Sequence, residues 1–160
     1  MLTFRPATKE DVDLLFQWAN DVTTRQNSYN RDLIKYEDHI KWFDKLINSS
    51  NCYCYIFSDK RKSEIGQVRI EKDELNSATI SISVDKDHRG KGSSTEMLQK
   101  ASIEFIKHNP RCTLVAFIFK ENIASFKTFL KAGFKDVKES VIKNIPSYVL
   151  FYNKENDERH

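Results

Sequence analysis

The sequence predicts a single α/β domain over residues 1–152, with a central sheet flanked by helices. Three observations support this class. Segments with strand-type alternation and segments with helix-type periodicity follow one another along the chain. Residues 79–98 combine a strand, a glycine turn and an amphipathic helix in direct succession. A chain of 160 residues, 39% of them apolar, has the usual length and composition of one globular domain.

The N-terminal part of the chain is expected to form one strand and two helices. Residues 2–5 predict a short strand, and Thr8 with Asp11 forms a capping-box variant that opens the first helix. The apolar stripe of this helix consists of Val12, Leu15, Phe16 and Ala19. A polar stretch over residues 20–30 follows. The second helix is indicated by apolar and aromatic residues at helical spacing, namely Tyr36, Ile40, Phe43 and Ile47.

The rest of the chain predicts further strands that alternate with two helices. The strands are expected over residues 52–57, 64–71, 77–84, 113–119, 134–141 and 147–152. A helix that begins near Ser93 ends at Asn109-Pro110, because proline cannot continue it. Another helix begins near Asn122 and stops at Gly133, a favoured residue after a helix end. Residues 153–160 are expected to form a disordered tail.

Composition and charge exclude several functional classes. The 26 Lys and Arg residues nearly balance the 23 Asp and Glu residues, which argues against a nucleic-acid-binding domain. No apolar run approaches the roughly 20 residues that span a bilayer, and the first residues lack the apolar core of a signal peptide. The cysteines, Cys52, Cys54 and Cys112, lack the spacing of a zinc site and are expected to be reduced thiols. We therefore expect a cytoplasmic protein without a metal site, a membrane partner or a nucleic-acid partner.

The turn Arg89-Gly90-Lys91-Gly92 has the chemistry of an anion site. The first backbone N–H groups of the helix that follows have no intrahelical partner and lie at the positive end of its dipole. Glycine lets the backbone approach a ligand closely, and Arg89 and Lys91 add full positive charges. Neither the Walker pattern nor the three-glycine Rossmann fingerprint is present. The turn predicts a phosphate or pyrophosphate site, and an ordinary solvated loop is the alternative on these four residues alone.

This turn resembles the first motif of the GNAT acetyltransferase superfamily, R/Q-x-x-G-x-G/A, whose amides hold the pyrophosphate of acetyl-CoA. Arg89 and Gly92 occupy its first two defined places, and Ser94 stands where the family usually has Gly or Ala. Ser94 adds a small side chain but can still donate its amide, so we interpret the segment as a variant of the motif.

Residues 122–134 resemble a second GNAT motif, N-x-x-A-x-x-x-Y-x-x-x-G-F. Asn122, Gly133 and Phe134 match it, whereas Ser125 replaces the Ala and Phe129 replaces the Tyr. The two motifs have the expected order and spacing, and the resemblance extends over nearly the whole chain. It implies the single-domain GNAT fold, a mixed sheet in which the two central strands splay apart.

The resemblance also implies acetyl-CoA as the co-substrate, with its pantetheine arm in the gap between the splayed strands. The peptide groups near Ile82 and Val84 would face the pantetheine and the thioester carbonyl. Asn122 would contact the pantetheine arm, and it also suits the N-cap of a helix. The residues implied to bind acetyl-CoA are Ile82, Val84, Arg89, Gly90, Lys91, Gly92, Ser93, Ser94, Thr95, Asn122, Ser125 and Phe129.

Proton transfer is left without the residues that related enzymes use. Acetyl transfer needs an uncharged amine, donors for the developing oxyanion and a proton for the leaving thiolate. Thr79 occupies the place of the usual carboxylate, and Phe129 occupies the place of the usual tyrosine. Tyr148, on a late strand, is the substitute general acid that the sequence offers. Catalysis by proximity and an oxyanion donor, with water supplying the proton, is the alternative.

The acceptor is expected to meet the first helices and the polar stretch between them. The candidate substrate-binding residues are Arg25, Asn27, Tyr29, Asn30 and His39. Many hydrogen-bonding groups suit a hydroxyl-rich or nucleotide-linked sugar, and a solvated loop with buried Trp18 and Trp42 is the alternative. The pattern W-x-N-D…R-x-N-S-x-N with H-x-x-W-F resembles a GNAT subgroup found with surface-polysaccharide and nonulosonic-acid biosynthesis. This resemblance implies an amino-sugar or nucleotide-sugar N-acetyltransferase.

Two other functions fit the same motifs. One is an acetyltransferase that modifies a protein N-terminus or a lysine side chain. The other is a non-catalytic acyl-CoA-binding module, which the departures at Thr79 and Phe129 would allow. GNAT proteins are often homodimers, and no exposed apolar stripe in the sequence commits this chain to that state.

Overall fold

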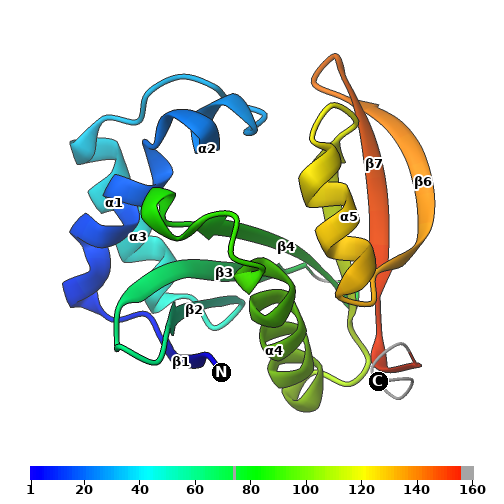
Figure 1. The fold of residues 1–160 in the computed structure, drawn as a ribbon, viewed down its shortest axis with the longest axis horizontal. Coiled ribbons are helices and arrows are strands. Elements are labelled where there is room, and N and C mark those ends of the chain that lie inside the picture. Colours follow the sequence, from blue (N-terminus) through cyan, green and yellow to red (C-terminus); the bar gives the residue numbers. More distant parts are fainter. Residues whose placement is uncertain (74, 156–160) are drawn as a thin grey trace.

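One mixed sheet of seven strands runs through the computed structural model, which describes residues 1–73 and 75–155 (Figure 1). The strand order is β1-β2-β3-β4-β5-β7-β6. Neighbouring strands are antiparallel except for β4 and β5, which are parallel. The strands are β1 (Thr3–Pro6), β2 (Cys52–Ser58), β3 (Glu64–Lys72), β4 (Ser77–Val84), β5 (Thr113–Phe119), β6 (Lys135–Ile142) and β7 (Ile145–Tyr152). This sheet confirms the α/β class and the mixed strand directions.

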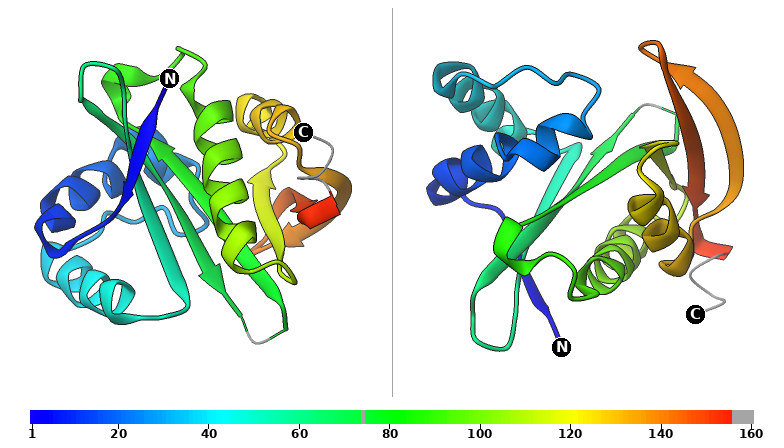
Figure 2. Two further views of the ribbon diagram at one scale, coloured as in Figure 1. Left: turned by 90° about the horizontal axis from the view of Figure 1, so that it is seen from below. Right: turned by 45° about the horizontal axis from the view of Figure 1, so that its top comes forward.

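The helices divide between the two faces of the sheet, as the two views of Figure 2 show. Helices α1 and α3 pack on one face of β2, whereas α4 packs on the opposite face of β2, β3 and β4. Helix α5 lies beside α4 and against β5. The helices are α1 (Val12–Ala19), α2 (Val22–Gln26), α3 (Tyr36–Asn48), α4 (Ser93–His108) and α5 (Ile123–Lys131), with short 3-10 turns η1 (Lys9–Asp11) and η2 (Lys86–His88). Helix α2 falls within the stretch that the sequence predicts only as polar.

Two separate hydrophobic clusters correspond to these two faces. The larger cluster joins the strands to α4 and α5 and includes Phe105, Leu114 and Phe134, all nearly inaccessible to solvent. The smaller cluster fills the space between α1, α3 and β2, where Trp18 and Phe43 are buried. Burial of apolar surface on both faces holds the sheet in the middle of the molecule.

The predicted capping box opens the first helical segment. The Thr8 N–H donates to Asp11 Oδ2 at 2.7 Å, and Arg5 donates to both carboxylate oxygens of Asp11 at 2.8 Å. The hydrogen bonds from Arg5 are the largest influence on the pKa of the Asp11 carboxyl, which is lowered although burial opposes the shift. The ion pair joins β1 to the turn that precedes α1, so the start of α1 has a fixed position.

The remaining sequence-based expectations concern the cysteines, the termini and the membrane. Cys52, Cys54 and Cys112 are free thiols. Within residues 1–73 and 75–155, no helix has the length and hydrophobicity needed to cross a bilayer. Of the tail expected to be disordered, residues 153–155 directly follow β7, and residues 156–160 lie outside the described part of the chain.

Candidate functional site

A cavity of about 780 Å³ lies where β4 and β5 separate. The two strands pair only at Ser77–Thr113, Ala78–Leu114 and Thr79–Val115, although β4 continues to Val84 and β5 to Phe119. The cavity is lined by both separated strands, part of β3, the turn before α4, one side of α5 along its length, and the segment from Ala19 to Asn30. The splay implied by the family resemblance is therefore present in the sheet.

The β4 side of the gap presents free backbone groups. The Asp85 N–H donates to the Ile65 carbonyl of β3 at 2.7 Å, which makes Ile65 and Asp85 a hydrogen-bonded antiparallel pair. Such pairs alternate along a ladder, so the peptide groups of Val84 and Ile82 point away from β3 and towards the gap. Their side chains pack against the larger hydrophobic cluster. Both residues line the cavity, with N–H groups available to a bound carbonyl.

The turn from Arg89 to Gly92 has the backbone of an anion cradle. Gly90 and Gly92 have φ angles of +75° and +76°, a region that side chains disfavour. A Cβ atom added to either glycine would meet nothing within 4 Å among the described atoms, so both face open space. Gly92 is the N-cap of the 16-residue helix α4 and supplies no capping side chain. The first amides of α4 therefore remain available, and Ser93, Ser94 and Thr95 all line the cavity.

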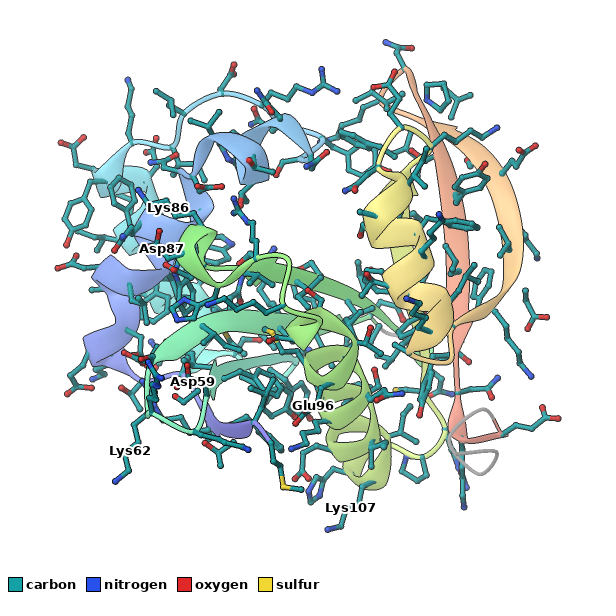
Figure 3. All side chains as sticks on the ribbon, in the orientation of Figure 1. Asp59, Lys62, Lys86, Asp87, Glu96 and Lys107 are labelled. Atoms are coloured by element: carbon teal, nitrogen blue, oxygen red, sulfur yellow. The ribbon has the colours of Figure 1, made fainter. Side chains whose placement is uncertain are left out.

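The single carboxylate in the first turn of α4 is directed elsewhere. Glu96 Oε2 accepts a hydrogen bond from the Leu2 N–H at 2.7 Å and pairs with Lys100 Nζ at 2.8 Å. Figure 3 labels Glu96 near the start of α4 and Lys107 near its end, an arrangement that suits the helix dipole. Because Glu96 is held against the N-terminal strand, it does not compete with an anion at the cradle.

Two contacts hold the cradle against helices α1 and α2. Asp85 accepts from Trp18 Nε1 of α1 at 3.0 Å and lies 3.0 Å from His88 Nδ1. Burial tends to raise the pKa of Asp85, but the hydrogen bonds from His88 and Trp18 outweigh it and the pKa is lowered. Arg89 donates to Asp21 Oδ2 at 2.6 Å, and Asp21 is also the N-cap of α2. Figure 3 labels Lys86 and Asp87 on η2, beside these anchors.

Helix α5 contributes the other predicted acetyl-CoA residues. Asn122 is the N-cap of α5, and its side chain accepts from the Ser125 N–H at 3.2 Å. Phe129 is buried and packs edge-to-face on Phe134. The predicted residues Asn122, Ser125 and Phe129 all lie along the cavity. Asn122 combines the N-cap role with a place at the site.

The part of the cavity where the sequence predicts the acceptor is formed by α2 and the segment after it. Arg25 is folded over this segment, with its Nε donating to the Ala19 carbonyl at 2.7 Å and Nη1 donating to the Asn30 carbonyl at 2.8 Å. The Tyr29 hydroxyl lies 2.7 Å from Ser147 Oγ on β7, and its ring packs edge-to-face on Phe119. The predicted residues Arg25, Asn27, Tyr29 and Asn30 all line the cavity.

Five lining residues of β3 and β4 were not among the sequence-based candidates. They are polar and occupy alternate strand positions, Gln67, Arg69, Thr79, Ser81 and Ser83. Gln67 Nε2 donates to Ser83 Oγ at 3.1 Å, and the Arg69 guanidinium lies over the Trp42 ring at 5.0 Å. Alternate polar residues on two neighbouring strands share one face of a sheet, so this pattern could have identified them.

His39 lies outside the cavity, and its predicted contact with the acceptor is not supported by its position. The side chain is 2% exposed, with Nε2 at 2.8 Å from the Val12 carbonyl and the ring among Phe16, Trp42 and Phe43. Burial is the main cause of the lowered pKa of His39. The apolar stripe predicted for this helix counted Tyr36 and Ile40, which are partly exposed, whereas His39 and Leu46 are buried with Phe43.

Tyr148 is likewise absent from the cavity lining. Its ring packs against Phe126 of α5, with centroids 4.4 Å apart, and Lys120 Nζ lies 5.5 Å from the ring centre. Successive residues of a strand point to opposite faces, and the neighbouring Ser147 is the one that contacts Tyr29. Tyr29 is therefore the tyrosine that the structure brings to the site.

The cavity has no candidate for a metal centre or a carboxylate base. No group of three or more His, Cys, Asp or Glu residues within the described chain could hold a metal ion. Among the described lining residues there is no Asp or Glu, and Thr79 has no acid–base function at neutral pH. An amine acceptor in this cavity would therefore have to lose its proton to a group other than a described carboxylate.

Comparison with known proteins gives the fold and the family. The spermidine N-acetyltransferase of Vibrio cholerae, solved with CoA and spermine, superposes with a TM-score of 0.86 at 16% identity over 98% of each chain. The aminoglycoside acetyltransferase AAC(6')-Ib, solved with coenzyme A, superposes with a TM-score of 0.82 at 17% identity, covering 99% of this chain and 98% of the other. These likenesses establish a shared fold.

A curated relative and a family model extend the likeness to sequence. YwnH of Bacillus subtilis (strain 168), named provisionally as a phosphinothricin acetyltransferase, is 27% identical over 141 residues, 84% of this chain and 85% of its own. The model of the acetyltransferase (GNAT) domain matches residues 1–135, which include β4, the cradle and α5. With this match and the splayed sheet, the chain belongs to the GNAT acetyltransferase family, and its co-substrate is acetyl-CoA.

Proposed function

We propose that this acetyltransferase transfers the acetyl group of acetyl-CoA to a primary amine of an amino sugar or a nucleotide-linked sugar. The supporting observation is the chemistry of the acceptor side. Its lining is rich in hydroxyl and amide side chains from two sources, the α2 segment (Thr23, Thr24, Asn27, Ser28, Asn30) and β3–β4 (Gln67, Thr79, Ser81, Ser83). Such groups can hydrogen-bond to several hydroxyls of one small ligand.

The proposed reaction uses the backbone more than side-chain acids and bases. The uncharged amine attacks the thioester carbonyl, a C–N bond forms, and the C–S bond to CoA breaks. The N–H groups on the gap side of Ile82 and Val84 are placed to stabilise negative charge on the carbonyl oxygen. The thiolate takes a proton from water or from the Tyr29 hydroxyl, and the amine loses one to water. Proximity within the cavity supplies much of the acceleration.

The bridge between Tyr29 and Ser147 favours a small acceptor over a protein chain. This contact joins the segment after α2, through the cavity-lining Tyr29, to β7. A peptide groove needs an open path for the chain on both sides of the modified residue, and the bridge would obstruct one side.

An acyl-CoA-binding module would share the cradle and the gap, and it differs from the proposed enzyme by having no turnover.

The test is acetyl-CoA consumption, read as free thiol, with amino sugars, nucleotide-linked amino sugars, peptides and polyamines as acceptors. Calorimetry of CoA binding is measured on the same preparation. Turnover with a sugar amine supports the proposal, and preferred turnover with peptides contradicts the acceptor class. CoA binding without turnover of any amine would identify a binding module.

A further inference from the structure

The charged residues that line the cavity all have cationic side chains or can become cationic. Among the described lining residues there are arginines, lysines and one histidine, and no Asp or Glu. Arg89 and Lys91 belong to the cradle, and Lys131 lies near the end of α5. Arg25 and Arg69 lie on the acceptor side, where acetyl-CoA phosphates are not expected. The acceptor side therefore has positive charge of its own.

Arg69 belongs to the face of the sheet opposite α4. It pairs with Ser81 of β4, and its guanidinium lies over the Trp42 ring of α3 at 5.0 Å. The cradle lies at the start of α4, which packs on the other face of β3 and β4. A group bound by Arg69 and a pyrophosphate at the cradle would thus lie on different faces of the sheet.

Arg25 and Arg69 line the same cavity, and their charges are only partly balanced within the described chain. Burial and the nearby positive charge of Arg69 together lower the pKa of Arg25. The hydrogen bonds of Arg25 go to the carbonyls of Ala19, Asn30 and Asp32 and to Ser28 Oγ, and none goes to a described carboxylate. Arg69 Nε forms an ion pair with Glu71 Oε1 at 3.2 Å, and because the Glu71 side chain is 49% exposed, solvent weakens this pair.

Two guanidinium groups that line one partly enclosed cavity repel each other, and a bound anion relieves that repulsion. Planar guanidinium donors also match the oxygens of carboxylate and phosphate groups. Arg25 donates mainly to backbone carbonyls of its own segment, so it contributes positive potential to the site and helps to shape it. Arg69 is better placed to donate directly, because its side chain is 29% exposed over the Trp42 ring.

We propose that the acceptor carries an anionic group, a carboxylate or a phosphate, in addition to its amine, and that Arg69 and Arg25 bind this group. The inference rests on the proposed acetyltransferase function and specifies its substrate class. It excludes polycationic acceptors such as spermidine or an aminoglycoside, because no lining carboxylate in the described chain would balance their charge.

Matched acceptor pairs test the charge requirement. One pair is an amino sugar and the same sugar as its 1-phosphate, and the other is an amino acid and its amide. We expect the anionic member of at least one pair to have a kcat/KM about tenfold higher or more, the size of one charged hydrogen bond. The phosphate and carboxylate pairs distinguish the two sources of the anion. Preference for spermidine or for the neutral members would overturn the proposal.

The variant Arg69→Gln assigns the preference to one side chain. It should raise KM for the anionic acceptor about tenfold and abolish the difference within the pair, with little change in KM for acetyl-CoA. Arg61→Gln removes an equal charge from the exposed β2–β3 turn and should retain the preference. Equal losses for both members of the pair in Arg69→Gln would show that Arg69 has only a structural role.

A binding experiment covers the case in which none of these acceptors is turned over. Inorganic pyrophosphate is titrated into protein saturated with CoA, which occupies the cradle. We expect binding that weakens about tenfold in Arg69→Gln and is unchanged in Arg61→Gln. Absence of binding, or binding independent of Arg69, overturns the anion site. Failure of CoA itself to bind overturns the proposed function instead. In that case, the dependence of pyrophosphate binding on Arg69 still shows whether the anion site exists.

Discussion

The guanidinium of Arg89 and the carboxylate of Asp21 form a 2.6 Å contact that joins the phosphate cradle to helix α2. Asp21 also accepts the Thr24 N–H at 3.2 Å and thereby caps α2. One carboxylate thus connects the acetyl-CoA side of the cavity with the acceptor side. Burial opposes the charged form of Asp21, but the hydrogen bonds from Arg89 and Thr24 lower its pKa.

Substitutions of Asp21 should affect the acceptor more than acetyl-CoA. Asp21→Asn keeps a capping oxygen but loses the ion pair, whereas Asp21→Ala loses both, and a lost N-cap costs about 0.5–2 kcal/mol. We expect acceptor KM to rise several-fold in Asp21→Ala and less in Asp21→Asn, as measured by steady-state kinetics with each substrate varied. Equal values for the two variants would show that capping of α2 is unimportant.

Gly92 tests the cradle directly. Gly92→Glu should abolish CoA binding in calorimetry, because it places bulk and negative charge where the pyrophosphate is expected. Gly92→Ala retains the neutral charge and costs about 1–2 kcal/mol through the positive φ angle, so it should weaken binding without abolishing it. Thermal unfolding of both variants separates loss of binding from loss of fold. CoA affinity at the wild-type level in Gly92→Glu would refute the cradle.

The Tyr29→Phe and Tyr148→Phe variants separate the two candidate proton donors. Tyr29 lines the cavity, whereas Tyr148 packs on Phe126 outside it. We expect Tyr29→Phe to lower kcat about 100-fold, the lower end of the range for general acid catalysis, and to have a larger effect than Tyr148→Phe. A fall in kcat confined to Tyr148→Phe would support the assignment made from the sequence.

His39 should make the fold sensitive to acid. Its folded pKa lies below the ordinary value of 6.5, so below about pH 6.5 the unfolded chain binds more protons than the folded one. Its contribution to stability is complete above this pH and is lost as the pH falls through the lower folded pKa. Urea unfolding from pH 8 to pH 5 measures this slope.

The variant His39→Leu should flatten this slope. It should also lower stability at pH 8 by about 1–3 kcal/mol, because the buried Val12 carbonyl loses its partner. His108→Leu, at an exposed position of α4, is the matched control and should follow the wild-type curve closely. An unchanged slope in His39→Leu would attribute the acid sensitivity to other groups.

The strands were predictable because their patterns are local. The bounds of β4 and β5 agree with the predicted 77–84 and 113–119, where alternation and apolar runs are clear. Helix α2 has five residues, too few to show helical periodicity, so the sequence predicts only a polar stretch there. The splay came from the family resemblance, since no local pattern states where two parallel strands cease to pair.

The acetyl-CoA half of the site was more predictable than the acceptor half. Residues from Arg89 to Thr95 are contiguous, so one motif locates them, and all of them line the cavity. Arg69 reaches the site from β3 through the tertiary fold, and sequence separation conceals it. His39 resembles a surface residue by type, yet its burial depends on how α3 rotates against α1. Only the folded structure shows that Tyr29 lines the cavity and that Tyr148 does not.

The early end of β4–β5 pairing has a consequence for the resting protein. Beyond Thr79, the two strands have unpaired edges inside the sheet, a feature normally confined to its outer margin. Water molecules must hydrogen-bond to those peptide groups until a ligand lies between the strands. Amide hydrogen exchange at Ile82 and Val84 should consequently be fast in the free protein and slow when CoA is bound. The interior of this sheet thus reports whether the site is occupied.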